Sequence, residues 1–129
     1  MPSYRTKKAL SSVENYGRVE GNYAQLTPIV LKDAQQMGQF KGIKWNDIKS
    51  NPKLYDKLVD WYWKRIEGHP FNIKSFKDKV IWWRAPALYK RTGGDVNKIK
   101  DKRLRNIFKN RLKNYRDVGY TGEALNDKK

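Results

Sequence analysis

Cysteine is absent from this sequence of 129 residues, and histidine occurs only once, as His69. The absence of cysteine excludes disulfide bonds, thiol nucleophiles and cysteine-bound metal sites. A single histidine cannot build a multi-histidine metal site. It stands between Gly68 and Pro70, a context typical of a helix stop rather than of catalysis. A carboxylate-bound metal stays open, but nothing in the sequence points to one, so we expect no metal and no cofactor.

Long apolar runs are lacking as well. No window approaches the roughly 20 apolar residues that a membrane-spanning helix needs. The N-terminus lacks the apolar block of a secretory signal. We therefore expect no membrane span and no signal peptide.

Acidic residues are scarce: the chain has 13 Asp and Glu against 29 Lys and Arg, a formal net charge of +16. A field of this size attracts polyanions whatever the fold, so DNA, RNA, an anionic membrane surface and the anionic bacterial cell wall are all candidate partners. Disordered basic tails are poor in aromatic residues. This chain has five Trp and eight Tyr, so we expect a folded basic domain.

The apolar residues recur at helical spacing and nowhere alternate over any length, which predicts an all-α fold. At most a small hairpin is expected near the N-terminus. The length suits one domain spanning residues 1–129, with a polar tail from about Gly119. We expect helices over residues 4–13, 28–37, 52–67, 73–85 and 100–115, a short helical piece after Pro86, and a break at Gly93-Gly94.

The stretch 73–85 is expected to be the buried central helix. Ile73, Phe76 and Val80 lie on one stripe with Trp83, and the neighbouring Ile81 and Trp82 widen that stripe beyond what a surface helix needs. Proline disfavours helical geometry in the residue before it, so the helix should end before Pro86. We expect this end to form one wall of a functional cleft.

The last helix has one apolar face, and basic residues occupy the rest of its surface. Solvation explains a mixed-charge face, but here cations dominate, which predicts attraction to a polyanion such as a cell-wall polymer or a nucleic-acid backbone. No helix-turn-helix, zinc-finger or ribonucleoprotein signature accompanies these residues. The candidate polyanion-binding residues are Lys102, Arg103, Arg105, Lys109, Arg111, Lys113 and Arg116.

Two segments resemble parts of a known family. Glu14 through Gln25, followed by Leu26-Thr27-Pro28, resembles the start of the lysozyme-like fold of lytic transglycosylases and phage cell-wall hydrolases, in which a helix ends in the catalytic Glu and a glycine-containing loop with a glutamine follows. Residues 82–86, Trp-Trp-Arg-Ala-Pro, resemble the family's aromatic-Asn-Ala-Gly segment before a Gly-Gly break and a final helix. Arg84 stands in place of the asparagine, and Pro86 in place of the glycine.

The resemblance implies cleavage of bacterial peptidoglycan by one carboxylate, Glu14 or alternatively Glu20. The acid would protonate the glycosidic oxygen, and either ring closure by the sugar's own hydroxyl or attack by water would follow. The compact size and the expected lack of a signal peptide suit a phage-type protein, delivered by a particle or released on lysis. The resemblance also implies a saccharide groove lined by Gln25, Tyr23, Trp83, Arg84 and Tyr89.

Other interpretations stay open. Any single glutamate is more often a solvated surface residue, and at least one of Trp82 and Trp83 is expected to pack in the core. A non-catalytic virion or packaging component could keep the fold and hold nucleic acid or a partner protein through its charge. A third hypothesis is a sequence-specific DNA-binding helical domain.

Overall fold

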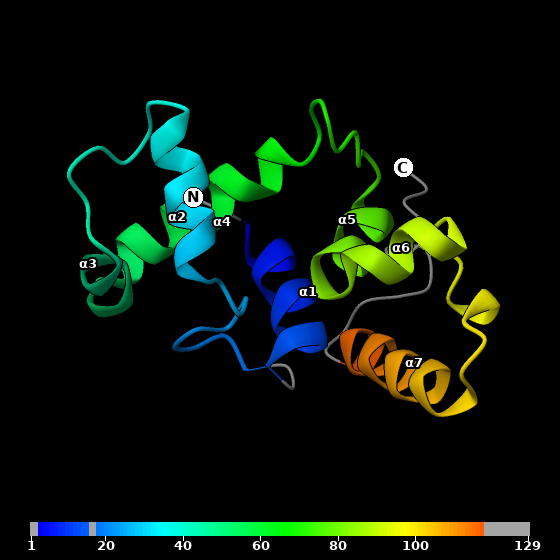
Figure 1. Cartoon of the computed structure of the whole chain (residues 1–129). Coiled ribbons are helices and arrows are strands. Elements are labelled where there is room, and N and C mark those ends of the chain that lie inside the picture. The colour runs from blue at the N-terminus through cyan, green and yellow to red at the C-terminus, as the bar shows by residue number, and fades with distance from the viewer. Residues whose placement is uncertain (1–2, 16–17, 118–129) are drawn as a thin grey trace.

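The computed structural model describes residues 3–15 and 18–117, except for the side chains of Lys77, Phe108 and residues 111–117. Within this part of the chain all regular structure is helical and no strand occurs, which confirms the all-α class (Figure 1). No helix of the described residues is long and apolar enough to cross a membrane. The elements are α1 (Tyr4–Glu14), α2 (Pro28–Gln36), α3 (Trp45–Ser50), α4 (Pro52–Arg65), α5 (Phe76–Arg84), α6 (Pro86–Thr92), the short 3₁₀-helix η1 (Val96–Lys98) and α7 (Lys102–Asp117).

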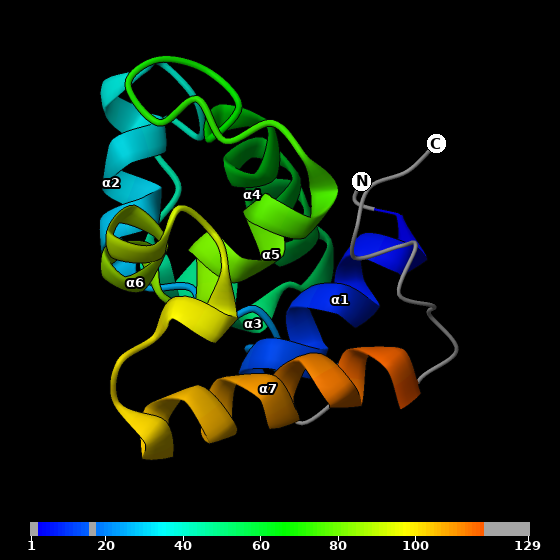
Figure 2. The same ribbon diagram turned by 90° about the vertical axis from the view of Figure 1, so that its right-hand side faces the viewer.

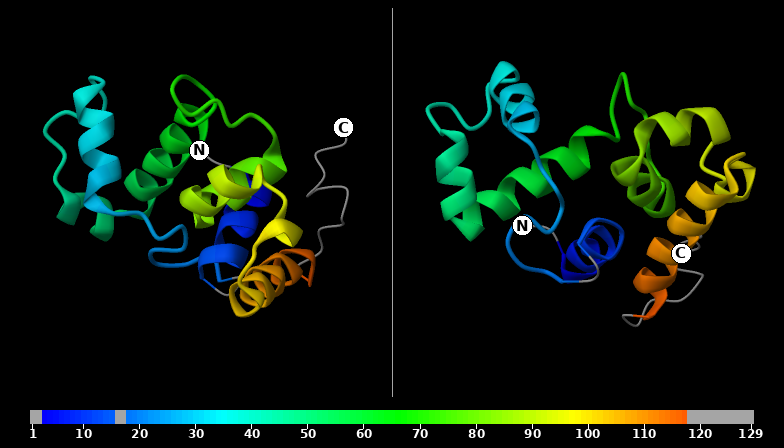
Figure 3. Two further views of the ribbon diagram at one scale, coloured as in Figure 1. Left: turned by 45° about the vertical axis from the view of Figure 1, so that its right-hand side comes forward. Right: turned by 60° about the horizontal axis from the view of Figure 1, so that its bottom comes forward.

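The helices form two groups with α1 between them. Helices α2, α3 and α4 lie at one end of the molecule, and α5, α6, η1 and α7 lie at the other (Figure 3). Helix α7 runs beside α1, and α5 also packs against α1 (Figure 2). Helix α1 therefore connects the two groups. The loop that follows α1 forms hydrogen bonds with both groups of helices.

Helix α1 is as deeply buried as the segment expected to be central. Its five successive residues Ala9, Leu10, Ser11, Ser12 and Val13 are all inaccessible to solvent. The small side chains among them let neighbouring helices approach closely. The two buried serine hydroxyls are not left unpaired, because both donate to the carbonyl oxygen of Lys8, at 3.0 and 2.7 Å. The buried centre of the fold is thus shared between α1 and α5.

The helix expected over 73–85 is present but begins later. Ser75 is its N-cap, with a hydroxyl that accepts a hydrogen bond from the Asp78 amide at 3.0 Å, so α5 starts at Phe76. Ile73 lies before the helix but is buried, as are Val80 and Trp82. The burial was therefore predicted correctly, and the N-terminal boundary was three residues too early.

Helix α3 was not predicted: no helix was expected between residues 37 and 52. The Asp47 carboxylate accepts a hydrogen bond from the Lys44 amide at 2.9 Å and so stabilises the start of this short helix. Trp45 packs against the core, where its neighbour Ile48 is fully buried. The polar tail expected from about Gly119 lies outside the described residues.

Candidate functional site

The loop between α1 and α2 (residues 18–27) is closed into a tight turn by Asn22. Its main-chain oxygen accepts from the Gln25 amide at 3.0 Å, and its side chain bonds Leu26 twice, accepting from the amide at 2.9 Å and donating to the carbonyl at 3.2 Å. Gln25 adopts a left-handed backbone conformation with φ of 52°. The turn is therefore a defined structure rather than an irregular connection.

Tyr55, a buried residue of α4, holds this turn in place through its hydroxyl group. The Tyr55 hydroxyl donates to the Asn22 side-chain oxygen and accepts from the Ala24 amide at 3.1 Å. Burial raises the pKa of Tyr55 to about 12, and the nearby charges of Asp56 and Glu14 act in the same direction. The hydroxyl therefore stays protonated at neutral pH and can keep both hydrogen bonds.

A second buried network holds Tyr23. Its hydroxyl donates to Asp56 at 2.9 Å, and the other oxygen of that carboxylate accepts from the ammonium group of Lys7 at 3.0 Å. Burial, and then the hydrogen bond to Asp56, raise the pKa of Tyr23. The rings of Tyr23 and Tyr55 also pack with their centroids 5.2 Å apart. Lys7 of α1 and Asp56 of α4 thus hold Tyr23 of the loop through a chain of hydrogen bonds.

Trp83 of α5 reaches the same turn from the other side. Its indole N–H donates to the carbonyl oxygen of Ala24 at 2.8 Å, across 59 positions of sequence. This bond joins the two segments on which the family resemblance rests. It brings the Trp-Trp-Arg-Ala-Pro corner against Gln25.

A small groove lies at this junction, with a volume of about 160 Å³. A cavity of about 150 Å³ holds a benzene molecule, so the groove accommodates one ring-sized group. We call it the Trp83 groove; the residues that line it are Gln25, Leu26, Thr27, Val30, Tyr62, Trp82, Trp83 and Pro86. Of the predicted sugar-binding residues, the structure therefore brings Gln25 and Trp83 together.

A larger cavity of about 590 Å³ lies on the other side of the turn, and we call it the Tyr23 cavity. Its size falls in the range of ordinary small-molecule sites, roughly 300–1,000 Å³. Leu26 and Thr27 line both hollows, so the two are adjacent. The wall also carries Glu20, Asn22, Tyr23, Trp45, Lys49, Tyr55 and Asp56. Tyr23 and the alternative acid Glu20 are brought together here.

The two candidate acids have different surroundings. Glu14 is half-buried at the end of α1, directly after the inaccessible Val13, and its charge is felt at the Tyr55 hydroxyl. Glu14 lines neither hollow. Glu20 lines the Tyr23 cavity, but its side chain is 74% exposed and lies 3.9 Å from the guanidinium of Arg18. The first acid is partly shielded from water, and the second is solvated.

Arg84 and Tyr89 are not brought to the groove. Arg84 is half-buried in the last turn of α5, and Tyr89 packs from α6 beside Gly94. Burial, and then the Asp78 carboxylate, raise the pKa of Tyr89. Neither side chain lines the Trp83 groove.

The predicted basic face of α7 is exposed as far as the structure describes it. Lys102, Arg103 and Lys109 face solvent, whereas Arg105 is half-buried and donates to the carbonyl of Ile99 at 2.8 Å. The side chains of Arg111, Lys113 and Arg116 lie outside the described residues.

Sequence reasoning missed the polar residues that organise the site, namely Asn22, Tyr55 and Asp56. Asn22 follows Gly21, a pair typical of turns, and this signal was used only to mark the loop. Tyr55 lies within the helix expected over residues 52–67. Its hydroxyl partner could not be inferred, because nothing in the local sequence pairs α4 with the loop 31 residues earlier.

In the described part of the chain, no three His, Asp or Glu side chains come together as a metal site requires. Comparisons with protein-family models, with curated proteins and with solved structures found no significant match to this chain.

Proposed function

We propose that this protein binds the glycan strands of peptidoglycan and cleaves them with one carboxyl group, that of Glu14. The observation that carries the proposal is the 2.8 Å hydrogen bond from Trp83 to Ala24, because it joins Gln25 and the tryptophan corner in one groove. These are the two segments that resemble lytic transglycosylases. A phage particle or host lysis as the route of delivery belongs to the same proposal.

The two adjacent hollows suit a polymer of rings. The Trp83 groove would hold part of one sugar ring, and the chain would continue over Leu26 and Thr27 into the Tyr23 cavity. Aromatic side chains offer faces on which sugar rings stack, while Gln25 and Thr27 are exposed and carry hydrogen-bonding groups. A glycan strand bound in both hollows would pass over the turn that Asn22 and Tyr55 hold in place.

Glu14 is the more shielded of the two acids, although it lines neither the Trp83 groove nor the Tyr23 cavity. A carboxyl group works as a general acid near neutral pH when an apolar, water-poor setting favours its protonated form. Glu14 follows a fully buried turn of helix, whereas Glu20 is solvated beside Arg18. The position of Glu20 on the wall of the Tyr23 cavity makes it the alternative.

The chemistry needs one carboxyl group and no metal. Glu14 would give its proton to the glycosidic oxygen as the bond from the anomeric carbon to that oxygen breaks. Its carboxylate would then take a proton from the nucleophile that attacks the anomeric carbon, either the muramic acid's own 6-hydroxyl or a water molecule. The first nucleophile gives an anhydro sugar, and the second gives a reducing end.

The test is release of soluble muropeptides from purified cell walls by three proteins: the native chain, Glu14→Gln and Glu20→Gln. A general acid contributes about 10²–10⁴-fold, so we expect Glu14→Gln to lose at least 100-fold of the rate. Glu20→Gln tests the alternative acid; it removes the same charge from a solvated site, so we expect a loss of less than about tenfold from it. Far-UV circular dichroism confirms that both variants are folded.

Two results would overturn the proposal. No release by the native protein would favour a non-catalytic basic component instead. Loss of release with Glu20→Gln, and retention with Glu14→Gln, would move the reaction to the Tyr23 cavity and contradict the assignment of Glu14.

A further inference from the structure

More than half of the net positive charge of this chain lies in residues 90–116. Residues 90–116 hold eleven Lys and Arg and only two acidic residues, Asp95 and Asp101. Eleven minus two gives this segment a net charge of +9, against +16 for the whole chain. The described residues in this segment form the end of α6, η1 and the start of α7. They meet at one corner of the molecule (Figure 1).

The two carboxylates of this segment are used for helix capping. Asp95 accepts from the Asn97 amide at 2.9 Å, and Asp101 accepts from the Leu104 amide at 3.1 Å. Within the described residues, neither forms an ion pair with a Lys or Arg. The surrounding cations are therefore not neutralised by them.

The cations themselves face solvent. Lys98, Lys100, Lys102 and Arg103, which we call the basic corner, are all exposed, and Lys109 extends them along α7. Lys102 and Lys109 are seven residues apart and so share one face of the helix, separated by about 10 Å along its axis at 1.5 Å per residue. Arg105 is excluded from the corner because it donates to the Ile99 carbonyl.

The composition of the corner indicates which polyanion it fits. The basic corner itself, within residues 98–103, contains no aromatic residue, so it offers no ring of its own on which an unpaired base could stack. Double-stranded DNA presents one phosphate charge per about 1.7 Å of helix axis, which places several phosphates within reach of a 10 Å row of cations. A sparse polyanion would engage fewer of them at once.

We propose that the basic corner binds double-stranded nucleic acid through its phosphates, without reading the base sequence. This surface is separate from the Trp83 groove and the Tyr23 cavity, since none of its residues lines either hollow. The inference does not rest on peptidoglycan cleavage: either function can fail while the other stands.

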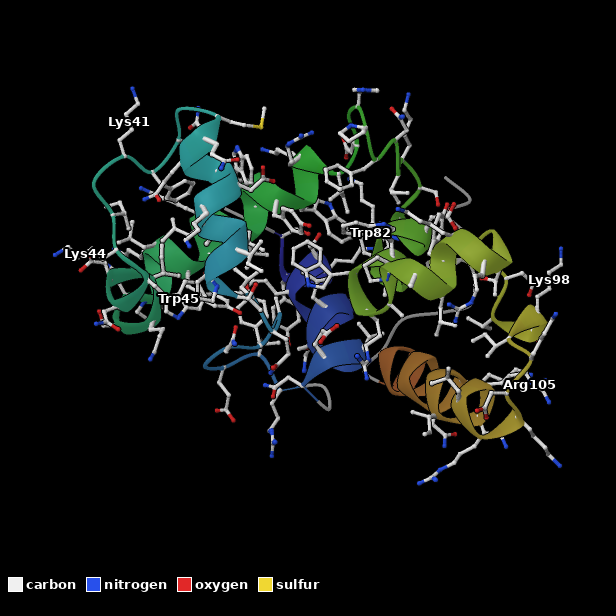
Figure 4. All side chains as sticks on the ribbon, viewed as in Figure 1. Lys41, Lys44, Trp45, Trp82, Lys98 and Arg105 are labelled. Carbon is white, nitrogen blue, oxygen red and sulfur yellow. The ribbon has the colours of Figure 1, made fainter. Side chains whose placement is uncertain are left out.

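The test compares two variants with the same loss of charge. One replaces Lys98, Lys100, Lys102 and Arg103 by glutamine. The control replaces Lys41, Lys44, Lys53 and Lys57, which are also exposed but belong to the α2–α3 loop and the α3–α4 end of the molecule. Figure 4 shows Lys41 and Lys44 at the opposite end from Lys98 and Arg105. Binding of each protein to a labelled 20-bp duplex is measured over a series of salt concentrations, and far-UV circular dichroism checks folding.

For the native protein we expect log K to fall steeply with log salt, equally for duplexes of unrelated sequence. Each phosphate contact contributes about 0.9 to that slope, so the corner variant should have a slope smaller by about 3 to 4 and at least tenfold weaker binding at low salt. The control should change the slope by less than about 1.

Three results would overturn the proposal. Equal weakening in both variants would mean that only net charge matters. A tenfold preference for one duplex sequence would mean that bases are read. Tighter binding to poly(glycerol phosphate) than to DNA, at equal phosphate concentration, would assign the corner to a cell-wall polymer.

Discussion

At the scale of single residues, Tyr55 determines the shape of the candidate site. Its hydroxyl bonds Asn22 and Ala24, and Ala24 in turn accepts the indole N–H of Trp83 at 2.8 Å. A buried donor or acceptor without its partner costs about 1–3 kcal/mol, so these few bonds strongly favour one loop conformation. The groove therefore depends on a residue that does not line it.

This arrangement predicts how stability depends on pH. The pKa of Tyr55 is about 12 in the folded protein, chiefly because of burial, and about 10 when unfolded. Below pH 10 both states are protonated and the stabilisation is complete. Between pH 10 and about 12 the unfolded state loses its proton first, so stability falls by at most about 2–3 kcal/mol.

Tyr55→Phe removes this titration. Urea unfolding from pH 8 to pH 12 should show a shallower alkaline loss of stability than in the native protein, while the variant is less stable by about 1–3 kcal/mol at pH 8 because Asn22 and Ala24 lose their partner. Lysine titration is common to both proteins and cancels in the difference. Parallel curves would show that the Tyr55 hydroxyl is not shielded from water.

The sequence identified some residues of the site and not others, for a physical reason. Gln25 and Trp83 were named because each belongs to a local pattern, a glycine-containing loop and an aromatic pair. Tyr89 was named with them as a groove residue that the resemblance implies, yet it does not line the Trp83 groove. The cavity that a helical side chain faces depends on how the helix packs against its neighbours, and a local sequence pattern does not contain that information.

At the scale of elements, boundaries depended on capping residues. The pairs Thr27-Pro28 and Asn51-Pro52 begin α2 and α4 as predicted, since proline suits the first helical position. The Gly93-Gly94 break also ends α6 as predicted, with both residues at positive φ. Helix α3 was missed because its six residues are too few to show an apolar period.

The two glycines of this break should respond differently to substitution. A Cβ on Gly94 would lie 2.9 Å from the Asp78 carboxylate and 3.0 Å from the Tyr89 ring, whereas a Cβ on Gly93 meets nothing within 4 Å. Gly93→Ala carries only the cost of a left-handed alanine, about 1–2 kcal/mol. Gly94→Ala carries that cost and the steric clash, which typically adds about 1–3 kcal/mol.

Urea unfolding of the two alanine variants measures this difference directly. Gly94→Ala should unfold at a clearly lower urea concentration than Gly93→Ala, with an unchanged slope of free energy against urea. Equal midpoints would show that α5 and α6 do not pack against the break as closely as described.

At the scale of the whole molecule, α1 and its loop bring together parts of the chain that are distant in sequence. The sequence predicted the class, the longer helices and the basic charge, all of which follow from composition and spacing. It placed the deepest burial in α5 alone, because the tryptophans are conspicuous and the small residues of α1 are not. The convergence of α4, α5 and the α1–α2 loop on one turn depends on tertiary hydrogen bonds and could not be predicted.

The most direct test of the account is whether a glycan occupies the Trp83 groove. Trp83 lines the groove and Trp45 lines the Tyr23 cavity, so their indole N–H signals report separately on the two hollows in NMR spectra of ¹⁵N-labelled Glu14→Gln protein. Signals are assigned with Trp83→Phe and Trp45→Phe. On titration with peptidoglycan glycan fragments, the account predicts that the Trp83 signal shifts in a saturable way. An unchanged Trp83 signal, with or without a shift of Trp45, would contradict it.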